Sequence, residues 1–288
     1  MKAIALFSKP ESPQAWGVLN EIVSWARIKG LATLVAEHDA GWTGTDWDSS
    51  YCEQVRAVTD MAIAIGGDGT LLGVARSLFG WNKPLLGVNL GTLGYLTDVA
   101  ARDVEKMLDA LLAEEFDIEH RILLQASVPD ATSGVAFRHL AFNDVVLRSR
   151  NGRLAQYDMF VDGQAVFSLK ADGLIVTTPT GSTAYALSAQ GPILHPSLAA
   201  IAVVPLCPHS LTARPITLPA SSRIEVVARG SAVSRVYLDG QPLSRELAEG
   251  DRIFVSQASA TVQMLHLKDY NLFRTLREKL NWSSPRES

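Results

Sequence analysis

The sequence has little cysteine and no cluster of metal-binding side chains. The two cysteines, Cys52 and Cys207, form neither a metal-ligand spacing nor a disulfide framework. Both stand among apolar residues, so we expect reduced core residues of a cytosolic protein. The six histidines are scattered without ligand spacing, and we expect His209 to be a packed polar residue rather than a catalyst.

A positive net charge and long hydrophobic runs are also absent. A net charge of −4 without a basic run argues against nucleic acid or an anionic membrane as a partner. No apolar run approaches the roughly 20 residues that a membrane helix needs. The apolar stretch at the N-terminus is too short for a signal peptide, which favours a cytoplasmic location.

The first part of the chain alternates strand-like and helix-like patterns. Strands are expected at 3–7, 31–37, 61–65 and 84–89, and helices at 13–29, 51–58, 71–79 and 104–116. Such alternation is typical of a parallel sheet covered by helices. A chain of 288 residues is long enough for two domains. We therefore predict a Rossmann-like α/β domain over residues 1–116.

Residues 117–267 have a different pattern, dominated by short strand-like runs. Two of these runs end in Asp-Gly, at 162–163 and 239–240, the dipeptide that suits a tight hairpin turn. One helix is expected within this region, at 183–191. The pattern predicts a second domain that is mostly antiparallel β.

The last segment, 268–288, returns to helical spacing. A lone amphipathic helix needs a surface on which to bury its apolar face. We therefore predict that this helix returns to the first domain, so that 1–116 and 268–288 form one unit beside the β-rich domain 117–267. The residues expected on its apolar face are Tyr270, Phe273, Leu276 and Leu280.

A glycine-rich stretch, Gly66-Gly67-Asp68-Gly69-Thr70, joins a predicted strand to a predicted helix. At such a junction the helix N–H groups are unpaired, and glycines let the backbone approach a phosphate. The stretch is not a P-loop, and it misses the dinucleotide fingerprint by one residue. A carboxylate repels phosphate, so Asp68 is predicted either to bind a metal that holds phosphates or to take a proton from a hydroxyl. The alternative is that Asp68 caps the helix.

Three further stretches carry polar side chains that suit a nucleotide. The turn at 87–96 contains Asn89 and is expected beside the glycine-rich stretch, or it is a structural turn. The segment 170–196 is rich in hydroxyl groups that suit ribose and phosphate, or it is a Thr-rich edge strand with a capped helix. Asn143 and Asp144 precede a strand, where they are suited to hold a base or a ribose, or they belong to an ordinary turn.

Together these stretches resemble the NAD kinase family. The segments that carry the resemblance are GGDGTLL at 66–72, NLGTLGYL at 89–96, FND at 142–144, DGLIVTTPTGSTAYALSAQGPILHP at 172–196, PHSLTARP at 208–215 and DGQ at 239–241. Their order and spacing run through most of the chain. GGDGT alone is shared with diacylglycerol kinases, sphingosine kinases and 6-phosphofructokinases, so the long segment 172–196 is the most specific part.

The resemblance implies a reaction and an architecture. The reaction is phosphorylation of the adenosine 2′-hydroxyl of NAD to give NADP. The donor is ATP or inorganic polyphosphate, together with a divalent metal, for which Mg²⁺ is the first candidate. The implied architecture is an N-terminal α/β domain and a C-terminal β domain with the site between them, assembled as homodimers or homotetramers.

The resemblance also implies site residues, although it assigns no metal ligands. By the family pattern Asp68 is the proton acceptor, and Asp68 and Gly69 contact the dinucleotide. Asn143 and Asp144 hold the adenosine side, where Asp144 is one carbon shorter than the Glu of many relatives. The other positions that match binding residues of the family are Arg153, Lys170, Asp172, Thr183, Ala184, Tyr185, Ala186, Leu187, Ser188 and Gln241.

Two other functions are compatible with a GGDGT scaffold. A lipid kinase of the diacylglycerol type would need an apolar cleft or a membrane-facing surface in place of the Thr-Gly loop. A non-catalytic nucleotide sensor would keep the fold without turnover. The presence of Asp68, Asn143 and the Thr-rich loop argues against a sensor.

Overall fold

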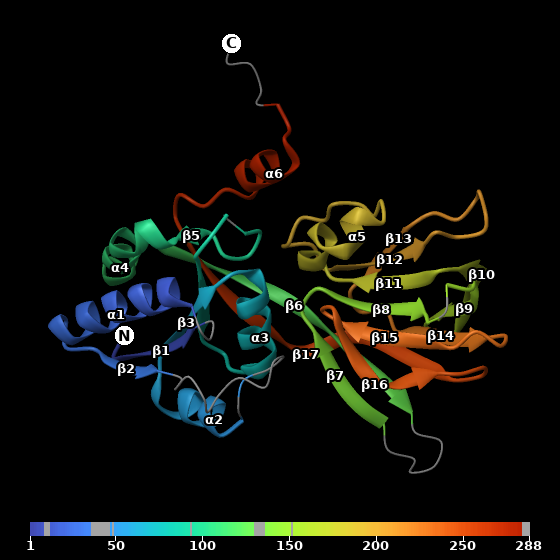
Figure 1. Cartoon of the computed structure of the whole chain (residues 1–288), viewed down its shortest axis with the longest axis horizontal. Coiled ribbons are helices and arrows are strands. Elements are labelled where there is room, and N and C mark those ends of the chain that lie inside the picture. The colour runs from blue at the N-terminus through green and yellow to red at the C-terminus, as the bar shows by residue number, and fades with distance from the viewer. Residues whose placement is uncertain are drawn as a thin grey trace. The chain divides into compact units, whose positions relative to one another are not determined.

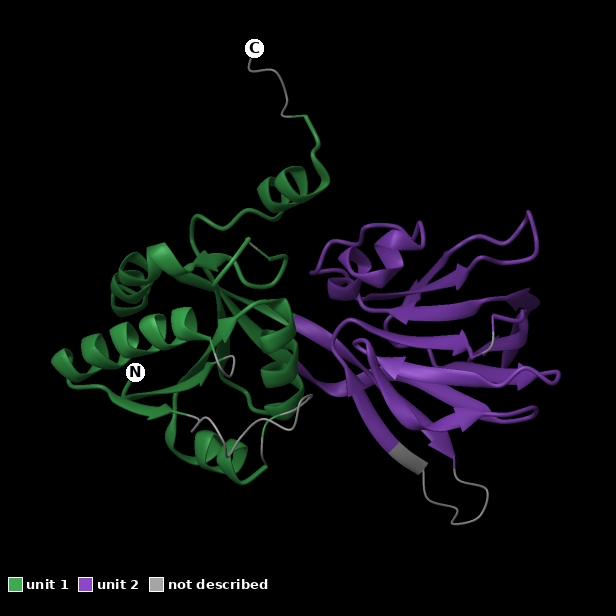
Figure 2. Ribbon diagram, viewed as in Figure 1, with its two compact units in different colours: residues 1–120, 262–288 green, residues 121–261 purple. Residues whose placement is uncertain are grey.

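The computed structural model of the protein (Figure 1) describes residues 1–8, 12–35, 47, 49–92, 94–129, 136–150 and 152–283. The chain divides into two compact units (Figure 2). Unit 1 comprises Met1–His120 and Val262–Ser288, and unit 2 comprises Arg121–Thr261. The chain passes from one unit to the other within two long strands, β6 (Phe116–Pro129) and β17 (Arg252–Leu267). The boundaries expected from the sequence, 116/117 and 267/268, instead coincide with the start of β6 and the end of β17.

The sheet of unit 1 is built on parallel strands, as predicted. Its strands β4 (Pro84–Asn89), β3 (Met61–Gly66), β1 (Ala3–Ser8) and β2 (Ala32–Val35) lie in that order, and the pairings among them are parallel. The end of β17 that belongs to unit 1 also pairs with β4 in parallel, as does the short β5 (Val99–Ala100). All residues of β1 and β3 are buried, as expected for strands that are covered on both faces.

Unit 1 also contains several helices among its described residues. They are α1 (Pro13–Ile28), α2 (Ser49–Val58), α3 (Asp68–Ser77), the 3₁₀ turn η1 (Ala101–Asp103), α4 (Val104–Leu112) and α6 (Leu272–Leu280). Helix α1 begins after Ser12, whose Oγ accepts a hydrogen bond from the Ala15 N–H at 3.2 Å, and Pro13 suits the first turn. It buries Val18 and Ile22, which are spaced by one helical turn, in a core shared with β1 and β3. This periodicity is the reason that α1 packs on the sheet.

Two helix boundaries predicted from the sequence differ from the structure by three or more residues. Helix α3 begins at Asp68 rather than at residue 71, because Gly67 is its N-cap and the helix follows β3 almost directly. Helix α4 ends at Leu112 rather than at residue 116. The cause is Glu114, whose positive φ of 56° turns the chain toward β6.

Unit 2 contains antiparallel sheets, which confirms the mostly antiparallel β region. One set of paired strands contains β10 (Gln164–Ala171), β9 (Ala155–Val161), β14 (Ile224–Arg229) and β17 in that order, and β6 pairs with β17 and with β7 (Ala136–Ala141). The second sheet has the order β13 (Ile216–Pro219), β12 (Ala200–Leu206), β11 (Gly173–Thr177), β8 (Asp144–Ser149), β15 (Ser234–Leu238) and β16 (Gln241–Leu247). One apolar core takes side chains from both sets, among them Tyr157 of β9 and Val176 of β11, so the sheets pack face to face.

Both Asp-Gly dipeptides form the expected hairpin turns. Asp162 and Gly163 have φ values of 50° and 79°, and Asp239 and Gly240 have φ values of 47° and 82°. A two-residue turn of this kind requires the left-handed region at both positions, which Gly adopts freely and Asp tolerates. These turns join β9 to β10 and β15 to β16.

Other expectations for unit 2 need correction. The strand-like runs of this region include 252–257 and 262–267, which the sequence separates, but both belong to the continuous strand β17. The helix expected at 183–191 is replaced by the 3₁₀ turn η2 (Thr180–Thr183) and the one-turn helix α5 (Tyr185–Ser188), because Ala184 between them is not helical.

Cys207 and His209 were expected to be packed in the interior, but both are exposed. Cys52, in contrast, is buried as expected. Cys207 follows the last residue of β12 in a left-handed conformation with φ of 44°, so the chain leaves the core at this point. His209, two residues further along, is exposed for the same reason.

The C-terminal helix belongs to unit 1, as predicted. Helix α6 begins after Asn271, whose Oδ1 accepts a hydrogen bond from the Arg274 N–H at 3.0 Å. It buries Thr275 and Leu276, whereas Phe273 is 59% exposed, so the expected burial of Phe273 is wrong. Among the described residues, no helix is both long and apolar enough to cross a membrane.

Candidate functional site

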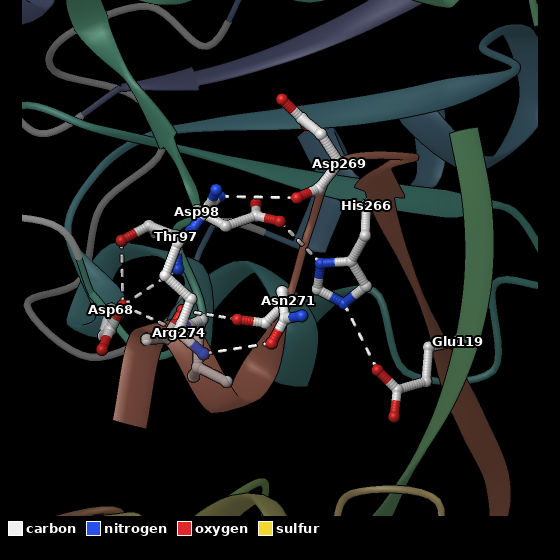
Figure 3. A network of polar contacts seen from close by, with 10 residues as sticks. Asp68, Thr97, Asp98, Glu119, His266, Asp269, Asn271 and Arg274 are labelled. Carbon is white, nitrogen blue, oxygen red and sulfur yellow. Dashed lines mark hydrogen bonds and ion pairs between the residues drawn. The ribbon is translucent and has the colours of Figure 1, made fainter. Parts of the chain in front are cut away.

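Asp68 is the first residue of α3, directly after the glycine-rich end of β3. Its carboxylate is held by a neighbouring segment, Tyr95–Thr97 (Figure 3). Oδ2 accepts the Tyr95 N–H at 2.9 Å, and Oδ1 accepts the N–H groups of Leu96 and Thr97 at 3.2 and 3.1 Å. The Thr97 hydroxyl donates a further hydrogen bond to Oδ1 at 2.9 Å. The side chain does not cap α3, so the capping alternative is wrong for the described structure.

A buried amide supports this arrangement. Asn89, the last residue of β4, donates from Nδ2 to the Thr97 hydroxyl oxygen at 2.6 Å, and its Oδ1 accepts the Gly91 N–H at 2.7 Å. Because the Thr97 hydroxyl accepts from Asn89, its own proton is directed to Asp68. Gly94 leaves room for the carboxylate, since a Cβ at this position would lie 1.9 Å from the Asp68 Oδ1. The turn at 87–96 therefore lies beside the glycine-rich stretch, as the sequence predicted.

In unit 2 a second carboxylate, that of Asp239, also accepts backbone N–H groups from a segment distant in the sequence. Asp239, in the turn between β15 and β16, accepts three consecutive backbone N–H groups, those of Phe142, Asn143 and Asp144, at 3.0, 2.7 and 3.2 Å. The Asp239 N–H in return donates to the Asp144 carbonyl oxygen at 3.0 Å. These contacts fix the bend in which Asn143 and Asp144 lie.

The Thr-rich loop packs against the same bend. Thr178 donates from its hydroxyl to the Phe142 carbonyl at 2.7 Å and from its N–H to the Asn143 carbonyl at 2.9 Å. Gly181 has no room for a side chain, because a Cβ there would lie 2.1 Å from the Asn143 carbonyl oxygen. The hydroxyl groups of Thr177, Thr178 and Ser182 are buried and donate to backbone carbonyls of the loop and the bend, so they hold in place the surface that contains Asn143.

A pocket of about 360 Å³ opens on this surface. Its lining residues are Asn143, Asp144, Val146, Arg148, Ala184, Tyr185, Tyr237, Asp239 and Gly240. Asp144 is only 3% exposed. The pKa of this carboxyl is raised from 3.8 to about 7, mainly by burial and also by the charge of Asp239, while the hydrogen bond from the Tyr185 N–H lowers it. Asp144 therefore changes charge near neutral pH.

This raised pKa predicts a pH-dependent effect of Asp144→Asn on stability. Between about pH 4 and pH 7 the folded protein keeps the Asp144 proton while the unfolded chain releases it, so the wild type loses stability as the pH rises. The Asn variant has no proton to lose. We expect the free energy of unfolding of the variant, relative to wild type, to increase by on the order of 2–3 kcal/mol from pH 5 to pH 8. Denaturant titration at both pH values measures it, and a difference that is constant with pH contradicts the assigned shift.

The remaining predicted residues lie in several places. Asp172 and Tyr185 line a second pocket, of about 450 Å³, which also contains Arg148, Arg150 and Arg235. Lys170 lines a third, of about 600 Å³, with His209 and Arg214. Gly69 is exposed in the first turn of α3. The positions outside these three pockets are Arg153 and Gln241, both exposed, and Thr183, Ala186, Leu187 and Ser188 in η2 and α5.

Several residues of these surfaces were not singled out from the sequence. Asp239 and Asn89 stand in turns and in two of the segments that carry the resemblance, but the sequence assigns neither of them a role in the site. It assigns no role to Thr97 or Tyr237 either. Asp-Gly turns are common, so the sequence offers no local signal that Asp239 reaches back to Asn143. The side chain of Ala186 is only a methyl group, and it packs in a small core with Val146. Only backbone atoms of Ala186 therefore remain outside this core.

A parallel sheet with a carboxylate at its glycine-rich strand–helix junction is typical of α/β proteins that bind ligands at the carboxyl ends of their strands. Two family models match the chain: residues 4–116 match the ATP-NAD kinase N-terminal domain, and residues 142–267 match the ATP-NAD kinase C-terminal domain. The NAD kinase of Aromatoleum aromaticum is 42% identical over 98% of this chain and 95% of its own length. The NAD kinase of Geobacter sulfurreducens is 40% identical over 98% of this chain and 99% of its own length. The chain belongs to the NAD kinase family.

Solved structures agree with this assignment. The yeast NADH kinase complexed with NADH aligns with a TM-score of 0.85 at 25% identity, over 100% of this chain and 89% of the yeast chain. An NAD kinase from Archaeoglobus fulgidus in complex with ATP aligns with a TM-score of 0.73 at 23% identity, over 99% and 100% of the two chains, and shows the common fold. The predicted fold class is confirmed by both.

Proposed function

We propose that this chain transfers the terminal phosphoryl group of ATP to the 2′-hydroxyl of the adenosine ribose of NAD, which gives NADP. As a member of its family the chain is a kinase that acts on an alcohol group of NAD. The observation that carries the detailed proposal is Asp68, a carboxylate fixed by the segment Tyr95–Thr97 at the start of α3.

We assign to Asp68 the role of general base. The ribose hydroxyl is a poor nucleophile while it keeps its proton. Asp68 takes that proton as the hydroxyl oxygen bonds to the terminal phosphorus and the bond from this phosphorus to the leaving ADP oxygen breaks. Oδ1 accepts three hydrogen bonds and Oδ2 accepts one, so Oδ2 retains capacity for the ribose hydroxyl. Fixing the base in this way supplies positioning, which is a large part of catalysis of phosphoryl transfer.

We assign the binding of NAD to unit 2. Asn143 and Asp144 are proposed to bind the adenosine, because they line a pocket with Tyr185 and Tyr237, whose rings suit a nucleobase or a sugar face. Asp172 and Lys170, which line the two larger pockets, are proposed to contact the rest of the dinucleotide. The other proposed contacts are Gly69, Arg153, Thr183, Ala184, Ala186, Leu187, Ser188 and Gln241.

We propose Mg²⁺ as the metal and ATP as the first donor, with polyphosphate as an alternative donor. The matching family descriptions name ATP. The described residues contain no group of three or more His, Cys, Asp or Glu that could hold a metal by themselves. Mg²⁺ usually keeps several waters and binds through one or two carboxylates and the phosphates of the substrate. The ion is therefore proposed to arrive with the donor, where it neutralises phosphate charge.

Product analysis tests the reaction and the donor together. The purified chain is incubated with Mg²⁺ and NAD, with either ATP or polyphosphate, and NADP is measured. We expect NADP with ATP, and its absence with both donors would overturn the proposed function. A parallel incubation of diacylglycerol with ATP tests the lipid kinase alternative, which the comparisons do not support. Sedimentation of the same sample tests the proposed homodimer or homotetramer, and fractionation of cells tests the proposed cytoplasmic location.

The space beside Asp68 gives a test that leaves the carboxylate in place. Gly94→Ala puts a methyl group 1.9 Å from the Asp68 Oδ1, so the carboxylate must move. A misplacement of about 1 Å costs about 10²-fold in rate, and we expect a loss of kcat of this order. Gly91→Ala is the matched control in the same turn, because a Cβ at Gly91 would lie 3.9 Å from the Asn89 Oδ1, which is an ordinary van der Waals contact. Equal kcat values for the two variants, measured by NADP formation, would contradict the proposed position of the base.

A further inference from the structure

A buried histidine and a buried aspartate form a pair in unit 1, close to the segment that holds Asp68. His266 lies near the end of β17, and its Nδ1 is 2.8 Å from the Asp98 Oδ2. The two side chains are 5% and 9% exposed. At this distance from a carboxylate oxygen Nδ1 carries the proton, so Nδ1–H donates to Asp98. The opposite ring nitrogen, Nε2, lies 3.5 Å from the Glu119 Oε2.

The histidine ring is itself held from the C-terminal side. It stacks on Tyr270 with ring centroids 4.1 Å apart and an angle of 13° between the planes. Tyr270 directly precedes Asn271, the N-cap of α6. The ring therefore has a fixed plane, and its two nitrogens point to two different carboxylates, as Figure 3 shows.

Asp98 connects this pair to Asp68. It directly follows Thr97, whose N–H and hydroxyl both donate to the Asp68 Oδ1. Figure 3 shows the contacts of His266 with Asp98 and of Thr97 with Asp68 in one network. The C-terminal helix also reaches the other end of this segment, since the Lys279 Nζ lies 5.9 Å from the centroid of the Tyr95 ring.

The segment needs such support because it belongs to no helix or strand. The described residues 94–98 have no regular secondary structure, and β5 begins only at Val99. Without a ladder of backbone hydrogen bonds, the direction of its N–H groups depends on side-chain contacts at its ends. A buried carboxylate such as Asp98 is costly unless it is paired, so its hydrogen bond to His266 defines one orientation of the chain at this point.

We propose that His266 is a positioning residue for Asp68: by holding Asp98 it fixes the segment Tyr95–Thr97 and thereby the direction of the catalytic carboxylate. This inference rests on the proposed role of Asp68 as general base. The histidine acts through Asp98 and Thr97 and does not touch the reacting atoms. The competing explanation is that His266 only fills space in unit 1.

Two variants of His266 separate these explanations. In His266→Asn the side-chain amide nitrogen takes the place of Nδ1 and can still donate to Asp98. In His266→Gln the amide lies near the place of Nε2, so it faces Glu119 and leaves Asp98 without its donor. Both variants lose the stacked ring on Tyr270, so their losses of packing are matched.

We expect His266→Gln to lower kcat by about 10- to 100-fold, because Asp68 is misdirected, with KM for NAD and for ATP within about twofold of wild type. His266→Asn is expected to keep kcat within about threefold of wild type. Melting temperatures of the two variants should agree, as their packing losses are matched. If the two variants have the same kcat, or if kcat follows the melting temperature, His266 only fills space and the proposal is overturned.

A double-variant cycle separates this proposal from the function on which it rests. In a chain that already carries Asp68→Asn, His266→Gln should cost less than about threefold more, because the group it positions is gone. An additional loss as large as in the wild-type background would overturn positioning through Asp68. Near-normal turnover of Asp68→Asn alone would instead overturn the general-base role. A normal loss for Asp68→Asn with an active His266→Gln would overturn only the positioning role.

Discussion

Replacing Asp68 by Asn is expected to lower kcat by about 10²–10⁴-fold, the usual contribution of a general base. The amide has nearly the size of the carboxylate, and its oxygen can still accept hydrogen bonds from the segment Tyr95–Thr97. It does not accept the ribose proton at neutral pH, so the hydroxyl must attack as a neutral group. Steady-state formation of NADP from NAD and ATP measures the loss.

The control for Asp68→Asn is the same substitution at Asp109, an exposed residue of α4 in the same unit. We expect Asp109→Asn to leave kcat unchanged. Circular dichroism and melting temperature should show that both variants are folded. Near-normal turnover of Asp68→Asn would remove the residue from the role of base and would leave it a structural acceptor at the start of α3.

The second large effect is expected at the bend that contains Asn143 and Asp144. Asn143→Ala removes hydrogen bonds of a neutral side chain, worth roughly 0.5–1.5 kcal/mol each, and Asp144→Ala removes a charged acceptor, worth roughly 1.5–3 kcal/mol. The KM for NAD should rise by about threefold for the first and up to about 100-fold for the second, at roughly 1.4 kcal/mol per factor of ten. The KM for ATP should change much less, because these residues are assigned to the adenosine of NAD.

This experiment is best done at pH 8, where Asp144 is charged because its pKa is raised only to about 7. Glu249→Ala, in an exposed turn of unit 2, is the control for loss of an acidic side chain. Each substrate is varied in turn at saturating levels of the other. If Asp144→Ala raises the KM for ATP and leaves that for NAD unchanged, the assignment of this pocket to the adenosine of NAD is wrong.

The sequence alone determined the features whose causes are local. Apolar residues in short runs predicted β1, β3 and β4, and the spacing of Leu19, Ile22 and Ala26 predicted α1, because strand and helix periodicities decide which side chains a segment can bury together. Asp239-Gly240 predicted a tight turn, since the φ values there favour these two residues. The glycine-rich stretch predicted the position of Asp68. An apolar run followed by glycines and then by helical spacing is typical of a strand that leads into a helix, and Asp68 lies at that junction.

Only the tertiary structure decided which distant residues hold Asp68, Asn143 and Asp98 in place. It also decided which predicted burial was wrong. Asp68 is fixed by residues 27 to 29 positions away, Asp239 holds Asn143 across 96 positions, and His266 meets Asp98 across 168. Helical spacing predicted that Phe273 lies on the buried face of α6, but Phe273 is exposed. Which face of α6 is buried depends on how the helix packs against the rest of unit 1. A local pattern reports what a segment is able to bury or cap. Which donor reaches a carboxylate from a distant segment depends on the packing of the whole unit, and the arrangement around Asp68 is therefore a property of the fold rather than of the motif.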